Sequence, residues 1–301
     1  MKIALFGKTF NAGFKPFVAE LFELLAANKV EISVYKPFYD FISCETGTEF
    51  PVSGYFTNAG DFDSGNDIVV SIGGDGTFLE SIPFVIHHEI PIIGINSGRL
   101  GFLANISKEN ITEAFQAILS GDFSYEYRSL ISVVMLSNPS TPLRVDLLFN
   151  GLNYALNDIT IHKADSSLIT IDAFINDEFL NRYWTDGLII STPTGSTAYS
   201  LSVGGPVVVP GSENVIIAPI SSHNLTVRPL IIPDSNTITL KVSSRSGVYC
   251  ITADNRTMQV HGEQTFIVGK SDYRLKMLKL PKTSFYETLR EKLKWGEDVR
   301  N

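Results

Sequence analysis

Short apolar runs alternate with helix-like periodicity from the start of the chain to about Gly121. The runs at 2–6, 31–35, 68–72 and 91–95 are typical of buried parallel strands. Apolar residues recur at helical spacing over 17–25, and further helices are expected at 78–87, where Pro83 should shorten or kink the helix, and between Ser107 and Gly121. Residues 37–66 are rich in Gly, Ser, Thr, Asn and Asp, which predicts a loop with little regular structure. Strands that alternate with helices indicate a parallel, doubly wound α/β domain.

From residue 125 onward the pattern changes to short β-rich runs. They lie at 130–136, 145–148, 168–175, 215–218, 238–242, 248–252 and 265–268. Asn176 and Asp177 are expected to form a hairpin turn between two of the strands. Helical periodicity returns at 285–295. We therefore predict three parts: an α/β domain at 1–123, an antiparallel, all-β domain at 124–282, and a C-terminal helix at 283–301 that packs against the first domain.

Composition narrows the class of protein. The 301 residues suffice for two domains, no apolar run reaches the roughly 18 residues of a membrane span, and the N-terminus lacks the features of a signal peptide. The formal charge of −8, without a basic run, argues against nucleic acid as a partner. Cys44 and Cys250 lie far apart and fit reduced thiols, and the five histidines show no metal-ligand spacing. We expect a cytoplasmic protein without membrane or nucleic-acid partners.

A glycine-rich turn, Gly-Gly-Asp-Gly-Thr at 73–77, follows the strand at 68–72. Glycine lets a ligand approach the main chain, and the bare N–H groups of such a turn form a concavity that holds anions. Asp75 is expected at the carboxyl end of a buried strand, where open α/β sheets bind ligands. We interpret the turn as a phosphate site that carries one carboxylate. The alternative is a tight turn that an aspartate caps.

Two later stretches carry groups that recognise a nucleoside. Asn157 and Asp158 interrupt an apolar run; an Asn side chain matches the edge of adenine, and a carboxylate accepts from ribose hydroxyls. The segment 185–206 is dense in hydroxyls and glycines, and its Tyr199 can stack on a base. The alternatives are a β-turn for the pair and a Ser/Thr-rich surface loop for the segment. The apolar run at 188–190 favours a fixed position for the segment.

Together, the three stretches resemble those of the NAD kinases. That family carries Gly-Gly-Asp-Gly-Thr, an Asn-Glu pair, and Asp-Gly followed by Thr-Pro-Thr-Gly-Ser-Thr-Ala-Tyr-Ser; the first and third match closely here, in the same order. The resemblance runs from about Ile68 to about Pro233 and includes Ser-His-Asn-Leu-Thr-Val-Arg-Pro-Leu at 222–230. The third motif is highly specific, whereas lipid kinases and phosphofructokinases share versions of the first.

The resemblance implies an ATP-dependent kinase that phosphorylates the adenosine ribose 2′-hydroxyl of NAD to give NADP. It implies a divalent cation, Mg²⁺, with ATP as donor, an assembly of two or four copies, and NAD binding by the β-rich domain. Asp75 would be the proton acceptor, and Asp186 would contact NAD, in some members from a neighbouring subunit. The implied binding residues, none of them a metal ligand, are Gly74, Gly76, Thr77, Leu79, Phe102, Asn157, Asp158, Asp186, Thr197, Ala198, Tyr199, Ser200, Leu201 and Ser202.

Three positions depart from the family pattern. Asp158 replaces the usual Glu and is one methylene shorter, which affects its reach to the ribose. Trp184 stands where some members carry Arg, and Arg99 takes a place often held by His. Large aromatic residues such as Tyr183 and Trp184 are either domain core or interface anchors.

Other functions stay open on the sequence alone. A lipid or sugar kinase would share the glycine turn, but would leave the stretch 197–202 unexplained. A non-catalytic NAD-binding module would leave the carboxylate in the phosphate turn unexplained. The choice of NAD or NADH as acceptor, and of ATP or polyphosphate as donor, is also open.

Overall fold

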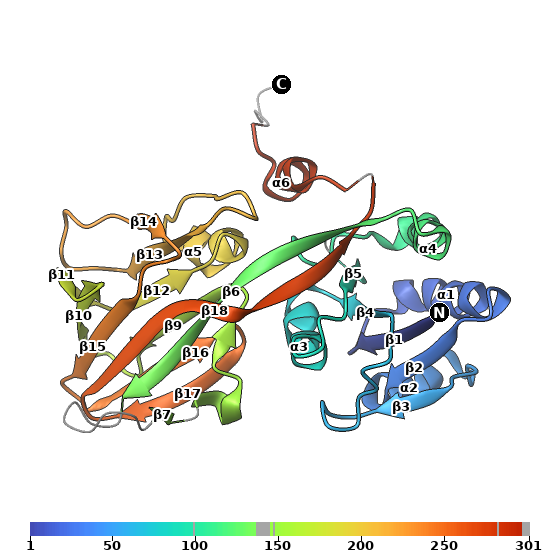
Figure 1. Cartoon of the computed structure of the whole chain (residues 1–301), viewed down its shortest axis with the longest axis horizontal. Helices are drawn as coiled ribbons and strands as arrows, with labels where there is room; N and C mark the ends of the chain where they lie inside the picture. Colours follow the sequence, from blue (N-terminus) through green and yellow to red (C-terminus); the bar gives the residue numbers. More distant parts are fainter. Residues whose placement is uncertain (99, 137–144, 147, 282, 297–301) are drawn as a thin grey trace. The chain divides into compact units, whose positions relative to one another are not determined.

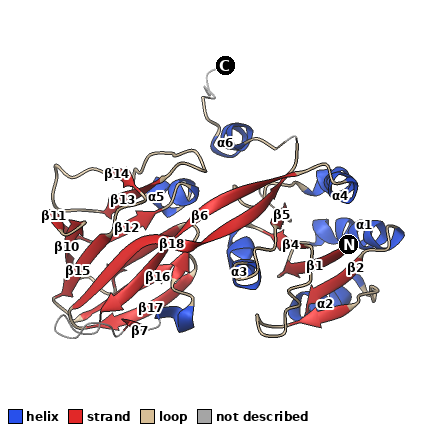
Figure 2. Ribbon diagram, in the orientation of Figure 1, coloured by secondary structure: helices blue, strands red, loops and turns tan. Residues whose placement is uncertain are grey.

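The computed structural model describes residues 1–98, 100–136, 145–146, 148–281 and 283–296 (Figure 1). The chain divides into two compact units, which are residues 1–127 with 275–301, and residues 128–274. Helices gather in the first unit, whereas strands dominate the second (Figure 2). Within the described residues, every helix is too short or too polar to span a membrane.

The first unit is built on a parallel sheet. Its strands are β1 (Lys2–Gly7), β2 (Glu31–Tyr35), β3 (Gly54–Phe56), β4 (Ile68–Gly73) and β5 (Ile92–Asn96). They lie in the order β3-β2-β1-β4-β5, and the end of β18 (Gln264–Lys279) pairs with β5 through Met277. Every residue of β4 is buried, as expected for a parallel strand that is covered on both faces.

Helices cover both faces of this sheet. They are α1 (Lys15–Ala27), α2 (Lys36–Thr46), α3 (Asp75–Val85) and α4 (Ile111–Ser120), with short 3₁₀ helices η1 (Ala12–Phe14) and η2 (Lys108–Asn110). Helix α6 (Phe285–Leu293) belongs to the same unit and contacts the ring of Phe102. Leu5 of β1 shares one apolar cluster with α1, α2 and α4. Phe6, the next residue, packs against Phe84 of α3 with ring centroids 5.4 Å apart. Because successive strand residues face opposite sides, α3 covers the other face.

The prediction of a loop at 37–66 was wrong. Helix α2 begins at Lys36, and Gly47 ends it in the left-handed conformation at φ 67°. Pro37 fixes a helical φ in the first turn, and Phe38, Tyr39 and Ile42 are buried along one side. Strand β3 follows. Composition averaged over thirty residues hid a short amphipathic helix.

Helix α3 differs in its bounds from the predicted helix at 78–87. It begins at Asp75, three residues earlier, and it ends at Val85 with Pro83 inside it. The glycine turn is therefore the first turn of the helix, and Gly74 is its N-cap.

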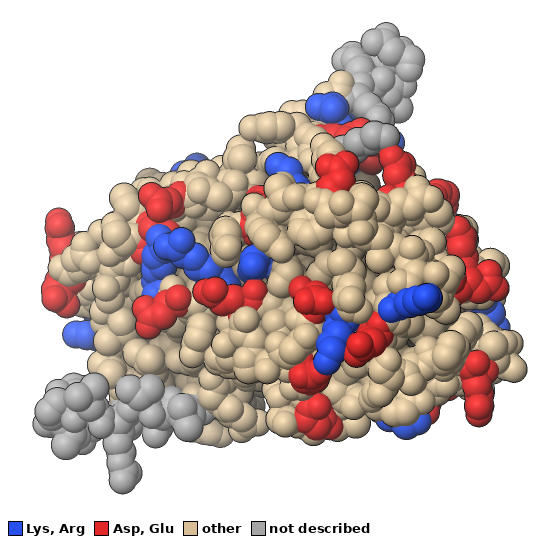
Figure 3. Space-filling model, turned by 45° about the vertical axis from the view of Figure 1, so that its right-hand side comes forward, with Lys and Arg blue, Asp and Glu red and all other residues tan. Residues whose placement is uncertain are grey.

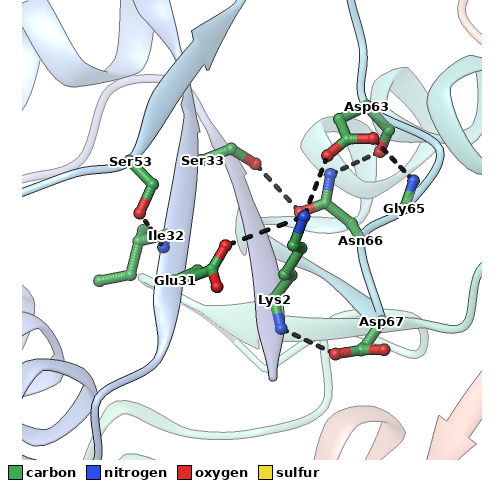
Figure 4. Close-up of polar contacts among 9 residues, drawn as sticks. All are labelled: Lys2, Glu31, Ile32, Ser33, Ser53, Asp63, Gly65, Asn66 and Asp67. Carbon is green, nitrogen blue, oxygen red and sulfur yellow. Dashed lines mark hydrogen bonds and ion pairs between the residues drawn. The ribbon is translucent and has the colours of Figure 1, made fainter.

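Polar contacts fix the loop that leads into β4 (Figure 4). The backbone N–H of Lys2 donates to Asp67 Oδ2 at 2.7 Å, and Ser33 Oγ donates to Asn66 Oδ1 at 3.2 Å. These bonds tie the loop to β1 and β2. They help to hold β4, which ends at the glycine turn, in register beside β1.

The second unit consists of two antiparallel sheets around one core. One sheet has the order β11-β10-β15-β18, with β6 pairing β18, β7 and β8; the other has the order β14-β13-β12-β9-β16-β17. The strands are β6 (Ser124–Leu136), β7 (Val145–Asp146), β8 (Tyr154–Ala155), β9 (Asp158–Lys163), β10 (Ile169–Ile175), β11 (Glu178–Thr185), β12 (Gly187–Ser191), β13 (Asn214–Ile220), β14 (Leu230–Pro233), β15 (Ile238–Ser244), β16 (Val248–Ala253) and β17 (Arg256–His261). Short helices are η3 (Leu148–Gly151), η4 (Thr194–Thr197) and α5 (Tyr199–Ser202).

The fold class predicted from the sequence is confirmed. An α/β part is followed by an antiparallel β part, and α6 returns to the first unit. The hairpin turn is also confirmed, since Ile175 pairs with Glu178 and the two turn residues have φ of 48° and 70°. Two successive residues at positive φ form the type I′ turn that suits the twist of a hairpin.

Candidate active site

The glycine turn places Asp75 at the N-terminus of α3. Strand β4 ends at Gly73, and the first helical hydrogen bond runs from Phe78 N–H to Gly74 O at 3.1 Å. The N–H groups of a first helical turn have no intrahelical acceptor, and the helix dipole there favours negative charge. Gly74 and Gly76 are exposed, and Thr77 and Leu79 are half-buried. This turn can therefore hold phosphate oxygens.

The Asp75 carboxylate also binds a second loop. Oδ1 accepts the N–H groups of Leu103 and Ala104, and Oδ2 accepts the N–H of Phe102, all at 3.0 Å. A Cβ on Gly101 would collide with this carboxylate, so only glycine fits there. Asp75 and the loop 101–104 thus form one structural unit. Of the residues in this loop, only Phe102 was predicted from the sequence as a site residue.

A lysine from α6 completes the surroundings of Asp75. Lys292 Nζ lies 3.2 Å from Asp75 Oδ2 and 4.5 Å from the centroid of the Phe102 ring. The ring of Phe102 in turn lies 6.1 Å from that of Phe285, at the start of α6. Sequence reasoning missed Lys292 because nothing in the helix distinguishes it from the other charged residues there.

In the second unit, Asp254 holds the turn that carries Asn157 and Asp158. Its carboxylate accepts the backbone N–H groups of Leu156 at 2.9 Å, Asn157 at 2.7 Å and Asp158 at 3.3 Å. Its own N–H donates to Asp158 O at 3.0 Å. Burial raises the pKa of the Asp254 carboxyl, while the backbone donors and Arg256 oppose that rise. Sequence reasoning missed Asp254, whose only signal was its place in an Asp-Asn turn.

The side chain of Asp158 is buried beside this carboxylate. Burial raises the pKa of Asp158 to about 7, the hydrogen bond from Thr160 Oγ1 at 2.9 Å opposes the rise, and the charge of Asp254 adds to it. We therefore expect Asp158 to be partly protonated near neutral pH, with Asp254, which has three backbone donors, as the ionised partner. A protonated carboxyl can donate a hydrogen bond, which an ionised one cannot.

The hydroxyl-rich segment folds against the same turn. Thr192 N–H donates to Asn157 O at 2.9 Å, and Thr192 Oγ1 donates to Leu156 O at 2.5 Å. A Cβ on Gly195 would collide with Asn157 O, so the two stretches touch through backbone atoms. The surface-loop interpretation is wrong, because Thr194, Ser196 and Ser200 are buried.

The other predicted residues of this segment differ in exposure. Tyr199 is 45% exposed, Ser202 is exposed, and Thr197, Ala198 and Leu201 are half-buried. The exposed ring of Tyr199 is available for stacking, whereas the buried Ser200 packs next to Gly205.

Asp186 lies between β11 and β12, and its Oδ1 is 2.6 Å from Lys163 Nζ. The two aromatic residues before it split between the predicted roles. Tyr183 is 3% exposed and belongs to the core, whereas Trp184 is 55% exposed.

The predicted residues thus form two groups, one on each unit. Asp75 and Phe102 come together in the first unit, and Asn157, Asp158 and the segment 192–202 come together in the second. Asp186 instead contacts Lys163 and Ile220. Within the residues that the structure describes, no three His, Cys, Asp or Glu side chains are grouped to hold a metal ion.

The chain matches known kinases over its whole length. Residues 18–123 match the family model of the ATP-NAD kinase N-terminal domain, and residues 156–280 match that of the ATP-NAD kinase C-terminal domain. The NAD kinases of Flavobacterium johnsoniae and Christiangramia forsetii are 39% and 41% identical to the chain over 302 residues, with 100% of each chain covered.

Two solved structures are also similar. Yeast NADH kinase complexed with NADH has a TM-score of 0.83 and 25% identity, over 100% of this chain and 89% of that one. An NAD kinase from Archaeoglobus fulgidus in complex with ATP has a TM-score of 0.70 and 24% identity, over 98% of this chain and 99% of that one, and supports the fold.

Proposed function

The chain belongs to the NAD kinase family, and from this premise we propose that it transfers a phosphoryl group from ATP to the adenosine ribose 2′-hydroxyl of NAD, giving NADP. The observation that carries the proposal is the packing of the hydroxyl-rich segment against Asn157, because it joins two nucleoside-recognition stretches. A lipid or sugar kinase would also bind the adenosine of ATP, so the match of both domains to the ATP-NAD kinase family is what favours NAD over those acceptors.

In the proposed reaction, Asp75 is the general base. The 2′-oxygen attacks the γ-phosphorus, the bond from that phosphorus to the bridging oxygen breaks, and its electron pair leaves with ADP. Asp75 accepts the hydroxyl proton. The first turn of α3 supports this role, because its N–H groups favour phosphate beside the carboxylate. We propose that Gly74, Gly76, Thr77, Leu79 and Phe102 line this part of the site.

We propose that Mg²⁺ enters with ATP as part of the substrate. Mg²⁺ prefers oxygen ligands, keeps several waters, and is usually held by substrate phosphates with one or two carboxylates. The phosphates of ATP and water would therefore supply its ligands, and Asp75 keeps its carboxylate for the hydroxyl proton.

We propose that the second unit binds the adenosine of NAD. Its binding residues would be Asn157, Asp158, Thr197, Ala198, Tyr199, Ser200, Leu201 and Ser202. The hydrogen bonds that the Asp254 carboxylate accepts from the turn 156–158 support this, because they hold Asn157 and Asp158 in a fixed geometry. A partly protonated Asp158 would donate to a ribose oxygen, which offers a role for an aspartate where the family carries Glu.

Tyr199→Ala and Asn157→Ala are each expected to raise KM for NAD by about tenfold, since stacking on a base and a bidentate Asn–adenine pair each contribute roughly 1–3 kcal/mol. KM for ATP should change little. Steady-state kinetics with each substrate varied in turn measures both constants. Tyr127→Ala is the matched control, because Tyr127 is 49% exposed and lies outside the proposed site. Equal effects on the two substrates would show that the residues are structural.

The function itself is tested with purified protein, NAD, ATP and Mg²⁺, reading NADP with an NADP-specific dehydrogenase. Parallel reactions replace NAD by NADH, sugars or lipids, and ATP by polyphosphate. Turnover of a sugar or lipid in preference to NAD would contradict the proposal. Tight NAD binding without turnover would instead support a non-catalytic module.

We propose that the protein works as a homo-oligomer of two or four copies. We also propose that Asp186 contacts NAD, and that in a shared site this is the NAD bound to the neighbouring subunit. Trp184, two residues earlier, is a large exposed aromatic, and such residues are enriched in interfaces. Among the described residues, Leu230 and Ile231 of β14 are also exposed apolar side chains.

Dilution through the dissociation range of the oligomer should therefore raise KM for NAD, because part of each site would be lost. Mass photometry in parallel gives the oligomeric state at each concentration. Trp184→Ala should shift dissociation to a higher protein concentration, whereas Phe179→Ala, at a residue of β11 that is also 55% exposed, is the matched control. Constant KM in a demonstrated monomer would rule out the shared site.

We also propose a cytoplasmic location without nucleic-acid partners. Both cysteines are free thiols, which fits a reducing compartment. On the face drawn in Figure 3, red acidic side chains are spread over much of the surface with blue basic ones among them, in keeping with the net charge of −8.

A further inference from the structure

We propose that Lys292, on the C-terminal helix α6, binds the donor phosphates at the glycine turn and releases the base, Asp75, when it does so. The inference rests on the proposed function and deepens it, because it assigns a phosphate-binding cation to the first unit.

The geometry places the ammonium group at the turn. Lys292 Nζ is within hydrogen-bond distance of Asp75 Oδ2, and the Phe102 ring lies 4.5 Å from it. The side chain is 32% exposed, so the ammonium group can also meet a ligand. The rings of Phe285 and Phe102 lie 6.1 Å apart, which holds the start of α6 near the same loop.

Binding of ATP at the turn would place negative phosphates beside the Asp75 carboxylate, and a cation would reduce their repulsion. ATP brings several negative charges, and the ionised Asp75 carboxylate repels them. The sequence of the first helical turn, Asp-Gly-Thr, supplies N–H groups and a hydroxyl but no cation. Lys8 is also near α3, but its Nζ lies 2.6 Å from Glu80 Oε2, which neutralises it. Lys292 differs from Lys8, because its counter-ion is Asp75, a residue of the turn itself. A phosphate bound at the turn can therefore replace Asp75 as the partner of Lys292.

The hydrogen bonds of Asp75 show why Lys292 must leave before Asp75 can act as the base. Each carboxylate oxygen has about two acceptor positions. Oδ1 accepts from Leu103 and Ala104, and Oδ2 accepts from Phe102 and Lys292. While Lys292 stays, no position is left for the hydroxyl of a substrate.

A move of Lys292 from Oδ2 to a phosphate oxygen therefore frees the acceptor that the base needs. During transfer, the bond from the 2′-oxygen to the γ-phosphorus forms, the bond to the bridging oxygen breaks with its electron pair going to ADP, and the hydroxyl proton goes to Oδ2. Lys292 keeps its proton throughout and acts by charge.

Lys292→Met tests this inference, because it keeps the length of the side chain and removes the charge. Loss of one charge-assisted contact should weaken Mg²⁺–ATP binding to the full chain about 10- to 100-fold, as measured by calorimetry without NAD. The kcat should also fall about tenfold, while KM for NAD stays within about twofold of the wild type. Lys292→Arg should restore most of both losses, since it restores the cation.

Arg290→Met is the matched control, because it removes a positive charge from an exposed position of the same helix. It should bind Mg²⁺–ATP like the wild type. Wild-type ATP binding and kcat in Lys292→Met, or equal losses in both variants, would overturn the inference. Higher activity in Lys292→Met would also overturn it, because the lysine would then be an inhibitory contact.

Two further readouts keep the outcomes distinct. A thermal unfolding midpoint within about 2 °C of the wild type would show that Lys292→Met is folded, as expected for a side chain that is partly exposed. If the wild type fails to phosphorylate NAD, the proposed function fails, whereas the calorimetric comparison still decides whether Lys292 binds donor phosphates.

Discussion

Asp75→Asn is expected to lower kcat for NADP formation by about 10²–10⁴, the range for loss of a general base. Asparagine keeps the shape of the side chain and one acceptor oxygen, so Leu103 and Ala104 can still donate to it. The amide group has no charge and cannot take the proton of the hydroxyl. Steady-state kinetics with saturating NAD and ATP measures the loss.

The control for this variant must distinguish loss of the general base from loss of the hydrogen bonds by which Asp75 holds the loop 101–104. Asp61→Asn is matched to it, since the Asp61 carboxylate likewise accepts backbone N–H groups, from Thr57 and Asn58, in an exposed loop of the same unit. It should leave kcat unchanged. Turnover of Asp75→Asn near that of the wild type would end the assignment of Asp75 as base. A large fall in its unfolding midpoint would show that the loop, rather than the chemistry, accounts for the loss.

Patterns that lie within one element allowed much of the fold to be predicted. The buried strands β1, β2, β4 and β5 follow from apolar runs, and the hairpin follows from two residues that tolerate positive φ. Helix α2 was missed because the polar residues around it dominate the composition, although Phe38, Tyr39 and Ile42 have helical spacing. The start of α3 was missed because glycines that follow a strand look like the end of regular structure.

The candidate site was predictable only where a motif is contiguous. The glycine turn and the hydroxyl-rich segment could be recognised because each is a single stretch of chain. Lys292 and Asp254 act across 217 and 97 residues of sequence, on Asp75 and on Asn157 respectively. Neither has a local pattern, since their roles depend on which loops the strands bring together. Periodicity and spacing carry no information on contacts of that kind.

The second large effect is expected for Asp254→Ala, which should lower the free energy of unfolding of the second unit by about 3–5 kcal/mol. The side chain of Asp254 is 3% exposed and accepts three backbone N–H groups. Alanine would leave those donors without an acceptor. It would also leave the half-buried Arg256, 3.7 Å from the carboxylate, without its counter-ion.

Tryptophan fluorescence can follow that unit alone. The chain has two tryptophans, and in a Trp295→Phe background only Trp184, in the second unit, remains. Because Trp184 is also a proposed interface residue, unfolding by urea is followed at a protein concentration below the dissociation range of the oligomer. Asp254→Asn keeps one acceptor oxygen and should lose less stability than Asp254→Ala. Asp172→Ala is the matched control, because the Asp172 carboxylate pairs with an exposed Arg182 at 2.6 Å and exposed ion pairs contribute little.

The same variants test whether the turn 156–158 serves NAD binding. If Asp254 holds Asn157 and Asp158 in place for adenosine, Asp254→Asn should raise KM for NAD at a temperature where it remains folded, and KM for ATP should not follow. Asp254→Ala with stability within about 1 kcal/mol of the wild type would show that the three backbone N–H groups find other acceptors. Lost stability with an unchanged KM for NAD in Asp254→Asn would make Asp254 a purely structural residue. NAD binding by Asn157 and Asp158 would then not depend on the hydrogen bonds that Asp254 accepts from their turn.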